Sequence, residues 1–134
     1  MTPVPVTLAT AAAAVFVNIW LGSRIAAHRR DFKCTVGDGG HEPLLRRMRA
    51  QANFIEHAPF FLILLLGLEL SGANRWALGT VALIFIVARI AHGIGMDADR
   101  DHRWRGYGMI ASALAGVVLA LFALVCVVGM CVGR

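Results

Sequence analysis

Four long apolar stretches divide the chain, and short polar segments separate each stretch from the next. A helix needs about 20 apolar residues to cross the hydrocarbon core of a bilayer, so the pattern predicts four membrane-spanning helices. We expect an all-α, polytopic four-helix bundle in which residues 1–134 form a single domain. The expected helices cover about residues 4–28, 44–71, 75–97 and 104–132.

The second apolar stretch is too short to cross a bilayer unless polar residues join it. Its uninterrupted apolar run, residues 58–68, has 11 residues, about half of what a span requires. The helix must therefore reach back to Arg49. It then carries Gln51, Asn53 and Glu56 into or near the membrane.

Composition agrees with this interpretation. Hydrophobic residues make up 58% of the 134 residues and charged residues 16%, with a mean hydropathy of +0.69. Soluble domains have about 45–50% apolar residues and about 25% charged residues. These values exclude a disordered tail, a coiled coil and a disulfide-stapled secreted module. The three cysteines, Cys34, Cys126 and Cys131, form no CxxC pair.

The basic residues gather in two of the three loops. The net charge is +5, and the arginines between apolar stretches indicate topology and anion binding rather than a nucleic-acid partner. Because basic loops stay on the cytoplasmic side, loops one and three are expected in the cytoplasm and both termini outside. The basic residues of these two loops are Arg24, Arg29, Arg30, Lys33, Arg46 and Arg47, then Arg100, Arg103 and Arg105, whereas the second loop offers Arg75.

Polar residues share one face of the second helix. Arg46, Arg49, Asn53 and Glu56 follow one another at intervals of 3, 4 and 3 residues, which is helical spacing. Gln51 falls on nearly the opposite face, where it is expected to point at lipid or at another subunit.

The same arithmetic extends the polar cluster to the next two helices. Arg89, His92 and Met96 share a face of the third helix, and Arg103 and Arg105 begin the fourth at the same membrane depth. Ionisable groups inside a membrane cost about 2.5–3.5 kcal/mol each even on the lowest scales, and they usually mark a functional site.

Two interpretations of this cluster are open. In the structural one, Glu56 pairs with Arg49 or Arg89 and holds the bundle together. In the functional one, the cluster binds a small zwitterion or anion, because arginine grips carboxylates in a bidentate fork while Glu and Asn hold ammonium or amide groups. An arginine beside a thiol also favours the nucleophilic thiolate.

The sequence lacks the residue patterns that calcium binding, other metal binding, phosphate binding, serine catalysis and nucleic-acid binding require. The run Asp97, Asp99, Asp101 imitates a calcium loop, but His102 and Gly108 stand where that loop requires Gly and Glu. The five histidines are scattered without ligand spacing, so we expect no metal. No phosphate-binding loop or serine nucleophile elbow occurs. The aromatic residues lie in apolar stretches or next to arginine at helix ends, as membrane-interface anchors do, rather than in base-stacking positions.

Small residues recur along the fourth helix. Gly108, Ser112, Gly116 and Ala120 follow at intervals of four. Such a row lets helices approach closely, within one bundle or between subunits, and has no catalytic implication.

Residues 49–60, Arg-Ala-Gln-Ala-Asn-Phe-Ile-Glu-His-Ala-Pro-Phe, resemble the signature of the MAPEG family, the membrane-associated proteins in eicosanoid and glutathione metabolism. The similarity continues in Gly-Asp-Gly-Gly at 37–40, in Ala-Arg-Ile-Ala-His-Gly at 88–93 and in Arg-Trp-Arg at 103–105. It covers essentially the whole chain, and the 37–40 loop resembles the short bacterial branch of the family.

The resemblance implies a homotrimer that binds glutathione between neighbouring subunits near the cytoplasmic face. Arg49, Asn53 and Glu56 would hold the glutathione backbone. Arg105, or as second choice Arg103, would face the thiol. The resemblance further assigns to the ligand site Gln51 and Arg29 (or Arg24) at the adjacent interface, and Arg89 and His92 on the third helix.

Two positions depart from the family pattern. His57 and Met96 stand where relatives have tyrosine. Both changes alter the polar groups offered to a bound peptide. His57 nevertheless belongs to the expected glutathione site by its position after the motif glutamate.

The expected function is that of a membrane glutathione transferase or peroxidase in the bacterial inner membrane. Its thiolate would attack a hydrophobic electrophile arriving from membrane lipid, with glutathione as co-substrate. The alternatives are a non-catalytic protein that binds glutathione or lipid, and a small proton-coupled exporter. The exporter is disfavoured because a glutamate beside Arg49 shuttles protons poorly.

Overall fold

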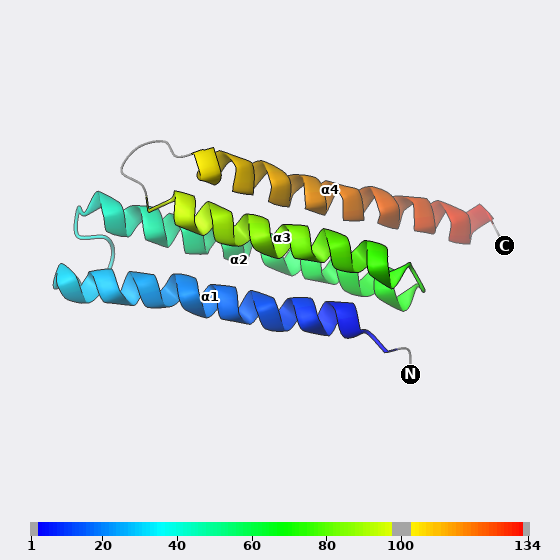
Figure 1. Cartoon of the computed structure of the whole chain (residues 1–134), viewed down its shortest axis with the longest axis horizontal. Helices are drawn as coiled ribbons and strands as arrows, with labels where there is room; N and C mark the ends of the chain where they lie inside the picture. The colour runs from blue at the N-terminus through cyan, green and yellow to red at the C-terminus, as the bar shows by residue number, and fades with distance from the viewer. Residues whose placement is uncertain (1–2, 98–102, 133–134) are drawn as a thin grey trace.

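Four α-helices account for most of residues 3–97 and 103–132, which the computed structural model describes (Figure 1). The helices are α1 (Pro5–Asp31), α2 (Glu42–Leu70), α3 (Arg75–Gly95) and α4 (Arg103–Val132). Each is long and apolar enough to cross a membrane. The predicted all-α, four-span architecture is confirmed.

The helix ends differ from the predicted bounds by a few residues, for local reasons. α1 continues to Asp31, and its last turn holds His28, Arg29 and Arg30, whose positive charges favour the carbonyl end of a helix. α2 begins at Glu42 with Pro43 in its first turn, a position where proline loses no hydrogen bond.

α2 and α3 form the middle of the bundle, with α1 against one side of them and α4 against the other (Figure 1). Their apolar faces meet in a core in which the rings of Phe61 and Phe85 stack with centroids 3.9 Å apart. Leu65 and Leu78 are also fully buried there. This layering leaves the outer faces of α1 and α4 to lipid or to other chains.

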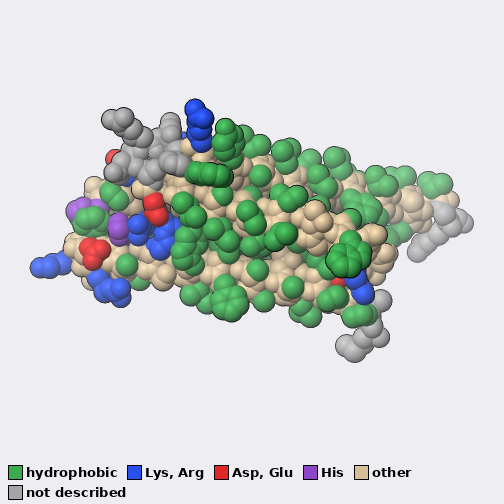
Figure 2. Space-filling view, viewed as in Figure 1, with side chains coloured by type: hydrophobic (Ala, Val, Ile, Leu, Met, Phe, Trp, Pro, Cys, Tyr) green, Lys and Arg blue, Asp and Glu red, His purple; other side chains and the backbone are tan. Residues whose placement is uncertain are grey.

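Charged side chains gather at one end of the bundle and apolar side chains cover its body (Figure 2). We call this the basic end; there α1 and α3 end and α2 and α4 begin (Figure 1). Asp97 pairs with Arg24 of α1, and its Oδ1 lies 2.9 Å from Arg47 Nε of α2. Asp97, two residues after α3, therefore links the end of α3 to α1 and α2. The described residues do not include Arg100, nor Asp99, Asp101 and His102 of the rejected calcium motif.

Close contact between α3 and α4 depends on Gly108. A Cβ added there would lie 2.5 Å from the Ala88 carbonyl oxygen and 2.5 Å from the His92 amide nitrogen. The row of small residues predicted at intervals of four is only partly the packing face. The residues of α4 buried within the chain are Gly108, Ser112, Ala115 and Leu119, because a contact face follows the helical repeat of 3.6 residues, from which a strict interval of four drifts away.

Gly108→Ala is expected to destabilise the protein by about 1–3 kcal/mol, since the added methyl group overpacks the α3–α4 contact. Thermal unfolding in detergent measures this loss. Gly106→Ala is the matched control, two residues away and with open space around its added Cβ; there the gain in helix propensity predicts a neutral or stabilising change of up to about 1 kcal/mol. Equal melting temperatures for the two variants would contradict the close contact.

The opposite end of the bundle holds a buried carboxylate that no sequence pattern indicates. Glu69, near the end of α2, is 4% exposed, and it accepts hydrogen bonds from the backbone amides of Val6 at 3.0 Å and Thr7 at 2.8 Å. The Thr7 hydroxyl also donates to it at 2.8 Å, and Arg75 Nε lies 3.9 Å away. Since α1 has no capping side chain of its own at Val4, Glu69 caps it from another helix.

Candidate functional site

A polar pocket of about 300 Å³ lies between α2, α3 and α4 near the basic end. Its wall contains five of the residues selected from the sequence, contributed by three different helices. They are Arg49, Asn53, Glu56, His92 and Arg105, joined by Ala52, Met96 and Met109. The predicted convergence of the polar faces is therefore present in the structure.

Arg89 lies behind this pocket rather than on its wall. Its side chain is 2% exposed, with Nη2 donating to Asn53 Oδ1 at 2.6 Å and Nη1 donating to Ser112 Oγ at 3.2 Å. A buried charge requires such partners. The structural interpretation that paired Arg89 with Glu56 is wrong, because Arg89 is held by Asn53 and Ser112.

The contact with Arg89 also orients Asn53. Because the side-chain oxygen of Asn53 accepts from the guanidinium, the NH₂ group remains as the donor that Asn53 offers on the pocket wall. Arg89 thus acts on the pocket by fixing the amide of a neighbour.

His92 connects α3 to the first turn of α4. Its Nδ1 lies 3.1 Å from the backbone carbonyl oxygen of Arg105. A carbonyl can only accept a hydrogen bond, so Nδ1 carries the proton and Nε2 is an acceptor in the neutral ring. This bond holds the backbone that carries the Arg105 side chain to the pocket.

An apolar groove of about 460 Å³ continues from the polar pocket along α2 and α4. Glu56 is common to both cavities. The groove is lined by His57, Phe60, Phe61, Leu64, Phe85, Ser112, Ala113, Gly116, Val117 and Ala120. The last two small residues of the α4 row, Gly116 and Ala120, therefore widen a groove.

His57 lies in the apolar groove, outside the polar pocket. Its Nδ1 is 2.8 Å from the carbonyl oxygen of Asn53, one turn earlier in α2. With Nδ1 as donor, the neutral ring presents Nε2 as an acceptor.

Gln51 and Arg29 lie on the α1 side of α2, away from the pocket. Gln51 Nε2 donates to Asn18 Oδ1 of α1 at 3.2 Å, so the expectation that Gln51 points at lipid is wrong, while its contact with another subunit stays a prediction. α1 covers that face of α2 and supplies the partner. Arg29 donates to the carbonyl oxygens of Thr35 at 3.2 Å and Gly37 at 3.5 Å in the loop after α1.

Of the two arginines at the start of α4, only Arg105 is on the pocket wall. Arg103 precedes it by two residues, which is about 200° around a helix of 3.6 residues per turn. Arg103 consequently occupies a different face of α4.

Met109 and Ser112 belong to the site and were missed as site residues. Both follow Arg105 at helical spacing, four and seven residues on. That spacing is the sequence signal that places both residues on the Arg105 side of α4, whereas the row of small residues indicates only a packing role for Ser112.

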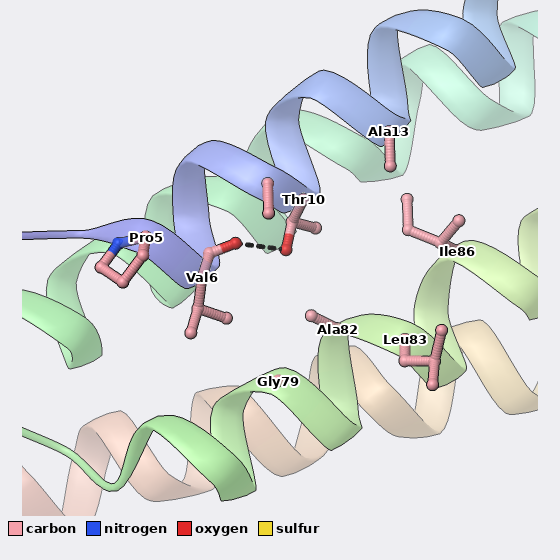
Figure 3. A pocket seen from close by; sticks show the side chains of 9 residues that line it. Pro5, Val6, Thr10, Ala13, Gly79, Ala82, Leu83 and Ile86 are labelled. Carbon is pink, nitrogen blue, oxygen red and sulfur yellow. Dashed lines mark hydrogen bonds between the residues drawn. The ribbon is translucent and has the colours of Figure 1, made fainter.

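A separate cavity of about 400 Å³ lies between α1 and α3 in the half of the bundle away from the basic end (Figure 3). Thr10 is its polar lining residue, and the Thr10 hydroxyl donates to the Val6 carbonyl oxygen at 2.6 Å. Such a surface suits apolar groups rather than a charged ligand. Among the residues that the structure describes, no three His, Cys, Asp or Glu side chains are grouped to hold a metal ion.

A bundle of four membrane-length helices with a polar pocket at one end defines an integral membrane protein with a candidate ligand site between its helices. The chain belongs to the MAPEG family, whose profile matches residues 7–125. It is similar to the inner membrane protein YecN of Escherichia coli strain K12, 30% identical over 93 residues, which are 69% of this chain and 70% of that protein. YecN of Escherichia coli O6:H1 matches with the same identity and coverage.

Proposed function

We propose that this protein is a membrane glutathione transferase or peroxidase, which binds glutathione in the polar pocket and attacks an electrophile held in the adjoining apolar groove. The observation that carries the proposal is that Glu56 lines both the polar pocket and the apolar groove. A pocket suited to a charged peptide therefore adjoins a groove suited to an apolar molecule. Membership of the MAPEG family supports it, since the family includes glutathione transferases.

The pocket offers a partner for each polar part of glutathione. Arg49 suits a carboxylate, which a guanidinium binds through two hydrogen bonds. Glu56 suits the ammonium group, and the Asn53 NH₂ suits a peptide carbonyl.

Arg105 is the group proposed to face the thiol. A guanidinium beside a thiol stabilises the thiolate, which is the attacking form. The thiolate sulfur then forms a bond to the electrophilic atom as the leaving group departs with its bonding electrons. With a hydroperoxide, the sulfur attacks the terminal oxygen, the O–O bond breaks and the departing alkoxide takes up a proton. The glutathione sulfenic acid so formed reacts with a second glutathione to give the disulfide and water.

We further propose that three copies assemble, and that Arg29 and Gln51 of one chain act at the site of its neighbour. Both residues lie on the α1 side of α2, remote from their own chain's pocket. We place the protein in the bacterial inner membrane, as the name of the relative YecN supports. The basic end then faces the cytoplasm, because arginine-rich loops remain on that side.

Calorimetric titration of the detergent-solubilised protein with glutathione tests the proposal. We expect saturable binding that Glu56→Gln weakens at least about tenfold, which corresponds to about 1.4 kcal/mol. Glu42→Gln is the matched control, since Glu42 is an exposed glutamate of the same helix that contacts Arg46 at 3.8 Å, away from the pocket.

The titration, together with measurements of thiolate absorbance and of activity, separates a glutathione enzyme from a non-catalytic binder. An absence of binding would overturn the proposal altogether. Binding without a thiolate absorbance, and without conjugation of an aryl halide or reduction of an organic hydroperoxide, would instead indicate a non-catalytic binder.

A further inference from the structure

A second apolar groove, of about 380 Å³, follows the contact between α3 and α4. Small residues of both helices line it, Ala88 and Ala91 from α3 and Gly108 and Ala111 from α4. It uses other residues of α4 than the polar pocket and its adjoining groove do. The proposed glutathione chemistry therefore makes no use of it.

The α3–α4 groove is open to the surroundings of the bundle. Two of its apolar wall residues, Leu83 and Val87, are 65% and 56% exposed. The helices that form it have the length and composition of membrane spans. Within a bilayer, the hydrocarbon chain of a lipid is an apolar group that such an open groove can hold.

One end of the groove carries the residues typical of the lipid headgroup level. Trp104 and Tyr107 line it at the basic end and are 56% and 60% exposed, and aromatic rings with one polar atom favour the membrane–water interface. Arg103 precedes Tyr107 by four residues and so lies on the same side of α4. A guanidinium matches the geometry of a phosphodiester.

We infer that the α3–α4 groove binds one anionic phospholipid, with an acyl chain along the small residues and the phosphate at Arg103. This assigns separate roles to two neighbouring arginines, Arg105 on the glutathione pocket and Arg103 on the lipid. Charge complementarity selects this occupant, because an anionic lipid neutralises the exposed Arg103 while its chain covers the apolar floor. The α3–α4 groove shares no lining residue with the polar pocket proposed for glutathione.

Thermal unfolding of the full-length protein in detergent, with added dioleoyl phosphatidylglycerol or dioleoyl phosphatidylcholine, tests the headgroup part. We expect the anionic lipid to raise the melting temperature by several degrees more than the zwitterionic lipid does, and Arg103→Gln to remove that difference. Lys33→Gln removes an exposed cation of the first loop as a matched control and should keep it. Equal shifts with both lipids, or an undiminished difference in Arg103→Gln, would refute the site.

Filling the groove tests the acyl-chain part. Native mass spectrometry should show a bound phosphatidylglycerol on the unmodified protein and at least a tenfold smaller bound fraction for Ala91→Phe. Leu114→Phe, at an exposed apolar position of α4 outside the groove, is the control and should retain the lipid. If Ala91→Phe instead keeps the lipid and changes the oligomeric state, a second copy of the chain covers the groove and the inference is wrong.

Discussion

Replacing Arg105 by alanine is expected to lower the turnover number for glutathione conjugation by about 10²–10³-fold, the effect of removing one group that stabilises a reacting anion. Arg105 is the arginine of α4 that lines the polar pocket. Its backbone is held by His92, through the 3.1 Å contact to the Arg105 carbonyl oxygen. The alanine variant keeps that backbone contact, so the loss should fall on chemistry rather than on folding.

Stopped-flow ultraviolet spectroscopy of the protein mixed with glutathione measures the same effect directly. The thiolate absorbance should appear with the unmodified protein and disappear with Arg105→Ala. Arg103→Ala is the matched control, since it removes an arginine from the same turn of α4 but from another face, and it should keep the absorbance. If Arg103→Ala loses the signal and Arg105→Ala keeps it, the assignment of the two arginines is reversed.

Replacing Glu69 by alanine is expected to lower the free energy of unfolding by about 2–3 kcal/mol, the sum of a lost helix cap and a lost charged hydrogen bond. The substitution leaves the amides of Val6 and Thr7 at the start of α1 without their acceptor. It also removes the carboxylate that lies near Arg75. α1 should therefore detach first from the end of the bundle away from the polar pocket.

Reversible unfolding in denaturing detergent measures the loss, with Glu56→Ala as the comparison. Glu56 is exposed on the pocket wall, so its removal should abolish glutathione binding while changing the unfolding free energy little. The two variants thus have opposite effects on stability and binding. A Glu69→Ala protein as stable as the unmodified one would show that the cap contributes nothing to folding.

The apolar pattern was sufficient to predict the four helices and most of the polar pocket. Period and length determine a membrane helix almost without reference to its neighbours, and the spacing of Arg49, Asn53 and Glu56 placed them on one face. In the structure these faces meet at the polar pocket, since a polar face inside a membrane turns toward another helix rather than toward lipid.

Residue spacing could not predict how each polar side chain is paired. Gln51 was predicted on the face opposite the polar cluster, and the position of α1 gives it Asn18 as a partner within the chain. Arg89 contacts Asn53 and Ser112 rather than Glu56. Such pairings depend on the distance and rotation between helices that are remote in sequence.

Among the acidic residues of the membrane helices, the sequence pattern indicated Glu56 as a site residue. The tertiary structure shows that Glu69 is the one of these two that is buried. Glu69 follows a long apolar run and lies next to the last residue of its helix, so nothing local distinguishes it from a residue at the membrane surface. Its role arises because α1 begins beside the end of α2, 62 residues away in sequence from Thr7 to Glu69. Sequence by itself determined the four spans and the polar faces, since these are properties of single helices; tertiary structure decided the pairings, the caps and the grooves, since each requires two helices at a particular separation.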